Sequence, residues 1–91
     1  MNRVDSVYIE KWAMIYAVLE SATYILSRYK NKEVNWYDTL RLIRLSVAEV
    51  FGERLGDEVH NEIAGYASAD TVEIIKKIQD ILVKRVIEEK R

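Results

Sequence analysis

Hydrophobic residues recur along this 91-residue chain at intervals of three and four, which is the period of an α-helix. Residues 5–29 carry a strict 4-3-4-3 apolar spacing, typical of a helix that lies lengthwise in a bundle. Between Ala13 and Leu19 this helix is apolar all round, so we expect it to be central in its bundle or partly covered by another chain. The stripe consists of Tyr8, Trp12, Ile15, Leu19, Ala22, Leu26 and Tyr29.

A second and a third helix are predicted after the loop "KNKEVN". Asn35 is expected to cap the second helix, which carries apolar residues on one face and ends at Gly52. The third helix is shorter, with Asp57 as its expected N-cap, and it breaks near Gly65.

Asp70 and Glu73 form the pattern of a capping box, which predicts a final helix that continues to about Glu89. Its predicted core face is Ile75, Ile78, Leu82 and Val86, flanked by Ile74 and Ile81. The chain lacks proline, which removes a common helix breaker, and it is too short for two cores. We therefore expect one all-α domain, residues 1–91, built as a roughly four-helix antiparallel bundle with one short helix.

Composition bears on the cellular compartment and on the kind of organism expected for this protein. The absence of cysteine excludes disulfides and thiolate metal sites. Charges interrupt the N-terminal sequence where a signal peptide needs an apolar run, and the most apolar stretch holds 15 residues, too few to span a bilayer. These features predict a cytoplasmic protein without membrane contact. Scarce glutamine and abundant Ile, Val, Glu, Lys, Arg and Tyr are typical of a thermophilic archaeon.

Charge is segregated along the chain although the net charge is only −1. Residues 53–73 carry six acidic side chains and one arginine, whereas residues 74–91 carry six basic and three acidic side chains. No predicted face is uniformly basic, so we expect direct nucleic-acid binding to be weak or absent. Within the acidic segment, Asp57, Glu58 and Glu62 are predicted to orient a protein partner.

Metal chemistry lacks support in the sequence. The all-helical nucleotide pyrophosphatases of the MazG type need a double-Glu motif that is answered by Glu-x-x-Asp on the next helix. Glu58 and Glu62 have the i,i+4 spacing of a paired ligand, but the chain contains no Glu-x-x-Asp. We therefore expect neither a metal nor another cofactor.

Arg54 and His60 are the candidate catalytic pair. Five residues separate them, and this spacing resembles the Arg-x(4–6)-His signature of the HEPN ribonucleases, which are also small helical bundles. The resemblance implies metal-independent RNA cleavage by the two side chains, usually brought together across a dimer. The alternative is that His60 is a half-exposed helix residue without catalytic function.

Aromatic residues cluster before residue 38, where they suit either a core or a protein interface, because tyrosine and tryptophan bury area while satisfying a polar tip. Two apolar residues of the final helix, Val83 and Ile87, are expected outside its core stripe and add to this surface. The predicted partner-binding residues are Tyr8, Trp12, Tyr16, Trp36, Tyr37, Val83 and Ile87.

In size, composition and helical plan the chain resembles the small accessory subunits of the family-B replicative DNA polymerases of Crenarchaeota. The resemblance implies a non-enzymatic subunit that docks on a large catalytic chain. Self-association is the other expected form of protein interaction. A HEPN-like ribonuclease and a helical adaptor of a crenarchaeal virus or plasmid are the alternatives.

Overall fold

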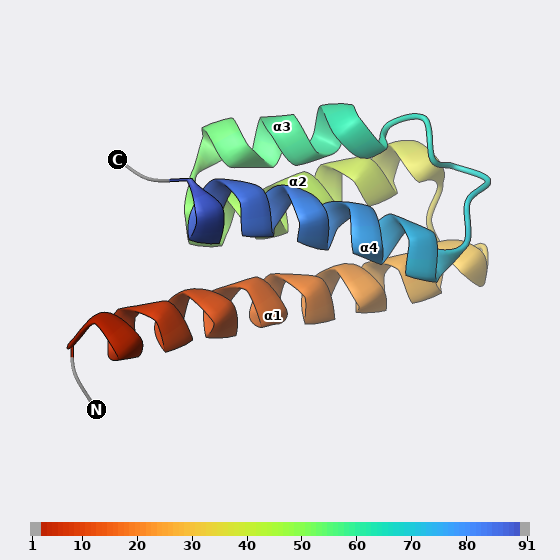
Figure 1. The fold of residues 1–91 in the computed structure, drawn as a ribbon. Helices are drawn as coiled ribbons and strands as arrows, with labels where there is room; N and C mark the ends of the chain where they lie inside the picture. The colour runs from red at the N-terminus through yellow and green to blue at the C-terminus, as the bar shows by residue number, and fades with distance from the viewer. Residues whose placement is uncertain (1–2, 90–91) are drawn as a thin grey trace.

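The computed structural model describes residues 3–89 and confirms an all-α bundle of four helices (Figure 1). The described part contains no strand and measures 46 × 21 × 21 Å. The last helix continues without a break into a π-helical segment, η1. The helices are α1 (Arg3–Lys30), α2 (Trp36–Phe51), α3 (Glu53–Ile63), α4 (Thr71–Leu82) and η1 (Val83–Glu88).

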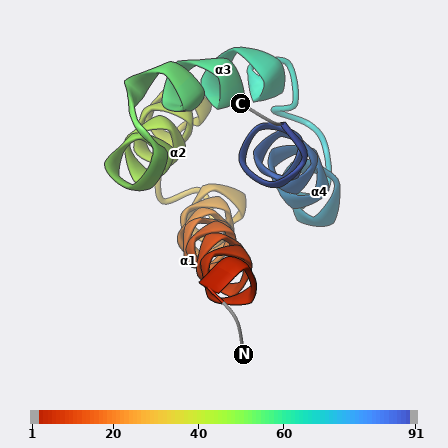
Figure 2. The same ribbon diagram turned by 60° about the vertical axis from the view of Figure 1, so that its left-hand side comes forward.

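The four helices surround one core. α2 and α4 run antiparallel to α1 and flank it on two sides, while α3 packs against both of them away from α1 (Figures 1 and 2). With 28 residues, α1 is about 42 Å long and far exceeds its neighbours. The core residues are Ile15, Val18, Leu19, Ala22, Leu26, Leu40, Ile43, Val47, Val59, Ile63, Ile74, Ile78, Ile81 and Leu82.

The core face of α4 differs from the predicted one. Ile74 and Ile81 are buried, whereas Ile75 is only partly covered. The apolar residues of this helix span about half of its circumference, so its periodicity alone does not fix which part of that half faces inward. Packing against both α1 and α3 selects the buried side.

A Schellman motif ends α1. The amide of Glu33 donates to the carbonyl of Arg28 at 2.9 Å, and the amide of Lys32 donates to that of Tyr29 at 3.0 Å. Lys32 takes the left-handed conformation, with φ 64°, at the position where glycine is usual. The Arg28 side chain also donates to the Glu33 carboxylate across the turn at 3.0 Å, and this bond raises the pKa of Arg28.

Side chains near the α1–α2 loop hold the connection between α3 and α4. The Tyr29 hydroxyl donates to the carbonyl of Ala67 at 2.8 Å, and the Trp36 indole nitrogen donates to that of Ala64 at 2.8 Å. The two rings also pack together, with centroids 5.0 Å apart. Trp36, predicted to bind a partner, is therefore partly buried and stabilises the fold.

The boundary between α2 and α3 is a single residue, Gly52, whose φ of 99° is a left-handed conformation that favours glycine. The predicted end of α2 is confirmed, as is Asn35 as its N-cap. The predicted start of α3 is wrong, because Asp57 lies inside the helix, four residues after its first residue, Glu53. Gly56 is also inside α3, where it packs closely against α2.

The helix α4 starts at the predicted position, but the predicted capping hydrogen bonds are not the ones observed. Asp70 occupies the N-cap, yet its side chain makes no capping hydrogen bond, so the predicted capping box is not formed. Helical structure continues to Glu88, close to the predicted end.

Val83 and Ile87, expected outside the core stripe, are partly buried against the core. Both lie in η1, where i→i+5 bonding widens the turn and redirects side chains relative to an α-helix.

Candidate partner-binding surface

Three aromatic side chains form a row on the N-terminal half of α1. Tyr8, Trp12 and Tyr16 follow at spacing four, so they lie along one side of the helix. The ring centroids are 6.3 Å apart for Tyr8 and Trp12 and 5.8 Å apart for Trp12 and Tyr16. Tyr8 is 50% exposed and Tyr16 is 59% exposed, whereas Trp12 is partly buried against the core. The row is a preorganised set of apolar contacts, open to solvent at both ends.

The N-terminal turns of α1 project beyond the other helices (Figure 1). No side chain described between Ser6 and Met14 is buried, and the first core residue of α1 is Ile15. Val7 and Ile9 are both exposed on these turns, and Ile9 lies on the side of the helix that carries the aromatic row. The apolar stripe predicted from the sequence therefore continues past the end of the bundle that should cover it.

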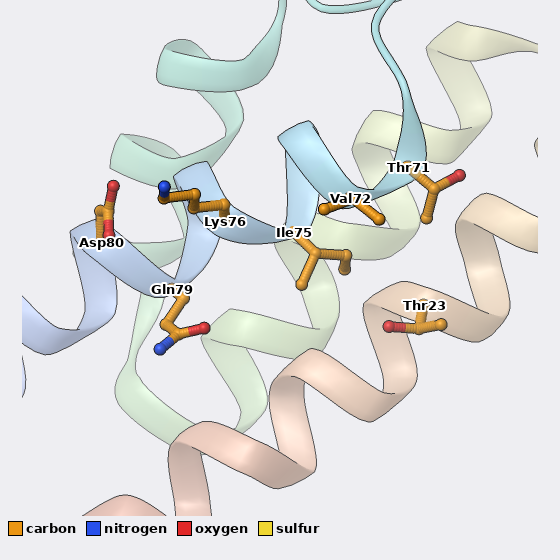
Figure 3. A pocket seen from close by; sticks show the side chains of 7 residues that line it. All are labelled: Thr23, Thr71, Val72, Ile75, Lys76, Gln79 and Asp80. Carbon is orange, nitrogen blue, oxygen red and sulfur yellow. The ribbon is translucent and has the colours of Figure 1, made fainter.

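An open pocket of about 470 Å³ lies between α1 and α4 (Figure 3). Ile75 and Gln79 of α4 point towards α1, where Thr23 forms the facing wall. Val72 stands at the edge of the pocket and is 78% exposed, the largest exposed fraction among the large apolar side chains described. The other lining residues are Thr71, Lys76 and Asp80.

A second hollow, of about 590 Å³, continues this groove along α1 and shares Thr23 with the first. Its lining includes Tyr16, the last ring of the aromatic row, and Glu20, its one charged residue. The row, the second hollow and the first pocket thus follow one another along α1. We call these features together the seam surface. It consists of one exposed side of α1 and the adjoining edge of α4, with the residues Tyr8, Ile9, Trp12, Ala13, Tyr16, Glu20, Thr23, Tyr24, Val72, Ile75 and Gln79.

The predicted partner-binding residues lie in four different places. Tyr8, Trp12 and Tyr16 belong to the seam surface. Val83 and Ile87 are partly buried in η1, which packs against α1 beside this surface. Trp36 belongs to the fold, as described above. Tyr37 is 68% exposed near the Arg41 guanidinium, but it lies on α2, on the other side of α1 from α4 (Figure 2).

The predicted acidic orientation patch is paired with basic residues of neighbouring helices. Glu58 accepts from Arg85 at 2.9 Å, and Glu62 lies 3.4 Å from the amine of Lys77. Asp57 lies 4.0 Å from the guanidinium of Arg44 and, contrary to the prediction, does not cap α3. The hydrogen bond with Glu58, assisted by its charge, raises the pKa of Arg85. These acids attach α3 to its neighbours, so their charge is largely compensated within the chain.

Arg54 and His60 lie on the same helix, six residues apart. Helix geometry places them about 120° apart around the axis and about 9 Å apart along it, so they do not converge within one chain. Arg54 lines a surface hollow with Arg85, whereas His60 makes one long contact of 3.5 Å to Asn61. Within residues 3–89, no three His, Asp or Glu side chains gather in the way that a metal ion requires.

Sequence reasoning missed several exposed apolar residues. Ile9 and Tyr24 belong to the seam surface, as does Val72, while Leu42 and Leu45 are exposed on α2. A second 4-3 spacing on α1, displaced from the core stripe, was a detectable signal for Ile9. Val72 had no comparable signal, because its exposure depends on which side of α4 is buried.

Comparison with protein-family models, with curated proteins and with solved structures finds no match. Within the described residues, no helix has the length and apolar character needed to cross a membrane. The fold and the surface thus define a small helical bundle with one extended, partly apolar seam.

Proposed function

We propose that this chain is a non-enzymatic protein–protein interaction module that binds through the seam surface. The observation that supports the proposal is the exposure of aligned aromatic and aliphatic side chains along α1, from the turns that project beyond the other helices to Tyr16 beside the core. Contiguous apolar surface rimmed by polar residues normally marks an association site. Tyr and Trp are also the residue types that contribute most to binding at interfaces.

The shape of the seam agrees with a helical partner. Two antiparallel helices with a groove between them accept a third helix, whose apolar residues enter the groove at spacings of three and four. Where the partner is a large catalytic chain of an archaeal replication complex, which the resemblance in size and composition implies, it occupies the seam surface in place of a second copy of this chain. In that case the module acts as an accessory subunit.

Site-specific photo-cross-linking tests the proposal. A benzophenone amino acid at Tyr16 is expected to form a covalent adduct with the partner in cells. The same group at Tyr37, of similar exposure on α2, serves as the matched control. An adduct from Tyr16 but not from Tyr37 supports the seam surface. No adduct from Tyr16, or equal adducts from both positions, contradicts it.

A further inference from the structure

α1 carries a second heptad-like stripe on the side away from the core. Its six positions follow a 4-3-4-3-4 spacing, and all six are exposed. Such a stripe forms a straight seam along about 27 Å of helix, the geometry by which two helices pack lengthwise. The stripe consists of Ile9, Ala13, Tyr16, Glu20, Thr23 and Ser27.

We propose that a second copy of this chain covers the stripe, with the two α1 helices packed antiparallel about a twofold axis. This proposal rests on the proposed function, because it names the partner of the seam surface. A twofold axis makes the same surface serve both copies, so every contact occurs twice.

Chemical complementarity selects the register of the pair. With the stripes fully overlapped, Tyr16 of each copy lies opposite Glu20 of the other. The tyrosine hydroxyl donates to the carboxylate, and this satisfies the one charged residue of the stripe. Ala13 then faces Thr23, and both are small enough to let the helices approach closely. The Thr23 hydroxyl already donates to the carbonyl of Leu19 at 2.8 Å, so covering it leaves no unsatisfied donor.

The same register explains the length of α1. The chain connection before α4 is held beside the C-terminal end of α1, where the Lys30 amine donates to the carbonyl of Ala69 at 2.7 Å. Val72 therefore lies near the end of the stripe that meets the projecting N-terminal turns of the other copy. Tyr8 and Ile9 of those turns, each about half exposed in one chain, are placed to cover Val72.

The area available suits a stable dimer. A fully buried aromatic side chain covers about 150–250 Å², so Tyr8, Tyr16 and Tyr24 can each bury about 100 Å² more. With Ile9, Val72 and the small residues of the stripe, each copy loses on the order of 700 Å² of exposed surface, close to the ~800 Å² per partner of a standard interface.

Mass measurement and a charge exchange test the dimer. Light scattering after size-exclusion chromatography should give twice the chain mass of 10.7 kDa. Tyr16→Glu places two carboxylates opposite each other in both halves and should weaken association about a hundredfold. Adding Glu20→Lys to the same chain should restore the dimer, because each new glutamate then faces a lysine. Tyr37→Glu is the matched control and should leave the mass unchanged.

Cysteine cross-linking reports the direction of the helices, since the chain has no cysteine of its own. Under mild oxidation, Ala13→Cys mixed with Thr23→Cys should form a mixed disulfide, while neither variant alone should form a disulfide-linked dimer. Disulfides from either variant alone would indicate another arrangement and overturn the proposal. A monomer mass at all concentrations would also overturn it. A Tyr16 photo-adduct to a different protein, combined with a monomer mass, would overturn the dimer but leave the interaction module standing.

Discussion

Gly56→Ala tests the close contact between α2 and α3. A methyl group at this position would lie 2.8 Å from the carbonyl oxygen of Arg44 and 3.2 Å from the Cβ atom of Ala48. The oxygen belongs to the backbone, so it cannot rotate away, and the two helices must separate. Such overpacking typically costs about 1–3 kcal/mol.

Helix propensity acts in the opposite direction at this site. Alanine in a helix interior is favoured over glycine by about 1 kcal/mol. An isolated helix with the sequence of α3 would therefore gain stability from Gly56→Ala. Because the clash is with a backbone atom, we expect it to cost about 2–3 kcal/mol, so that the free energy of unfolding falls by about 1–2 kcal/mol after the gain in propensity. The melting temperature of a domain of this size should then fall by about 5–10 °C.

Urea unfolding followed by circular dichroism measures this difference, at one fixed protein concentration because association alters apparent stability. Gly65→Ala is the matched control, since nothing lies within 4 Å of the added methyl group. It should leave stability unchanged or raise it by roughly 0.4–1 kcal/mol. A Gly56→Ala variant as stable as the wild type, or more stable, would refute the close approach of α2 and α3.

Four further changes test other parts of the structure. Lys32→Gly should raise the free energy of unfolding by about 0.5–1 kcal/mol, because glycine takes the left-handed conformation without strain; a lower urea midpoint would contradict the Schellman motif. Trp36→Phe should lower it by roughly 1–2 kcal/mol through loss of the indole hydrogen bond, and an unchanged midpoint would contradict that bond. RNA incubated with the wild type or with His60→Ala should remain intact, whereas cleavage lost in the variant would establish the ribonuclease alternative. Because the pKa of Arg85 is raised, its ion pair with Glu58 persists at every pH below the range in which arginine ordinarily titrates. The difference in urea midpoint between wild type and Arg85→Gln should therefore stay constant from about pH 7 to pH 10. It should shrink in about 0.5 M NaCl, because salt screens the pair. A difference that grows with salt would contradict the pairing.

The helices themselves were largely predictable, because their signals are local. The period of apolar residues located all four, and Asn35 and Gly52 identified both ends of α2. These residues act within one turn of their own helix, through a side chain that accepts a backbone hydrogen bond and a backbone that adopts positive φ. A few consecutive residues therefore contain all the atoms that form these helix ends.

The segment "RLGDEVHNE" shows where local reasoning fails. Asp57 is the predicted N-cap of α3, yet this helix begins at Glu53, and the neighbouring Gly56 lies inside it as a contact point whose missing side chain admits α2. The local sequence predicts surface charge at Asp57, Glu58 and Glu62 but not their partners, which are basic residues of α2, α4 and η1. Neither role is visible until the other helices are in place.

The sequence by itself determined the all-α class, the number of helices and the unusual length of the apolar stripe on α1, since periodicity is a property of consecutive residues. Only the tertiary structure decided which side of α4 is buried, which aromatic residues hold the fold and which stay exposed. Those outcomes depend on competition among several helices for one core. The core of α1 begins only at Ile15, so Tyr8 lies in solvent beyond it, whereas Tyr16 lies beside the core but points away from it.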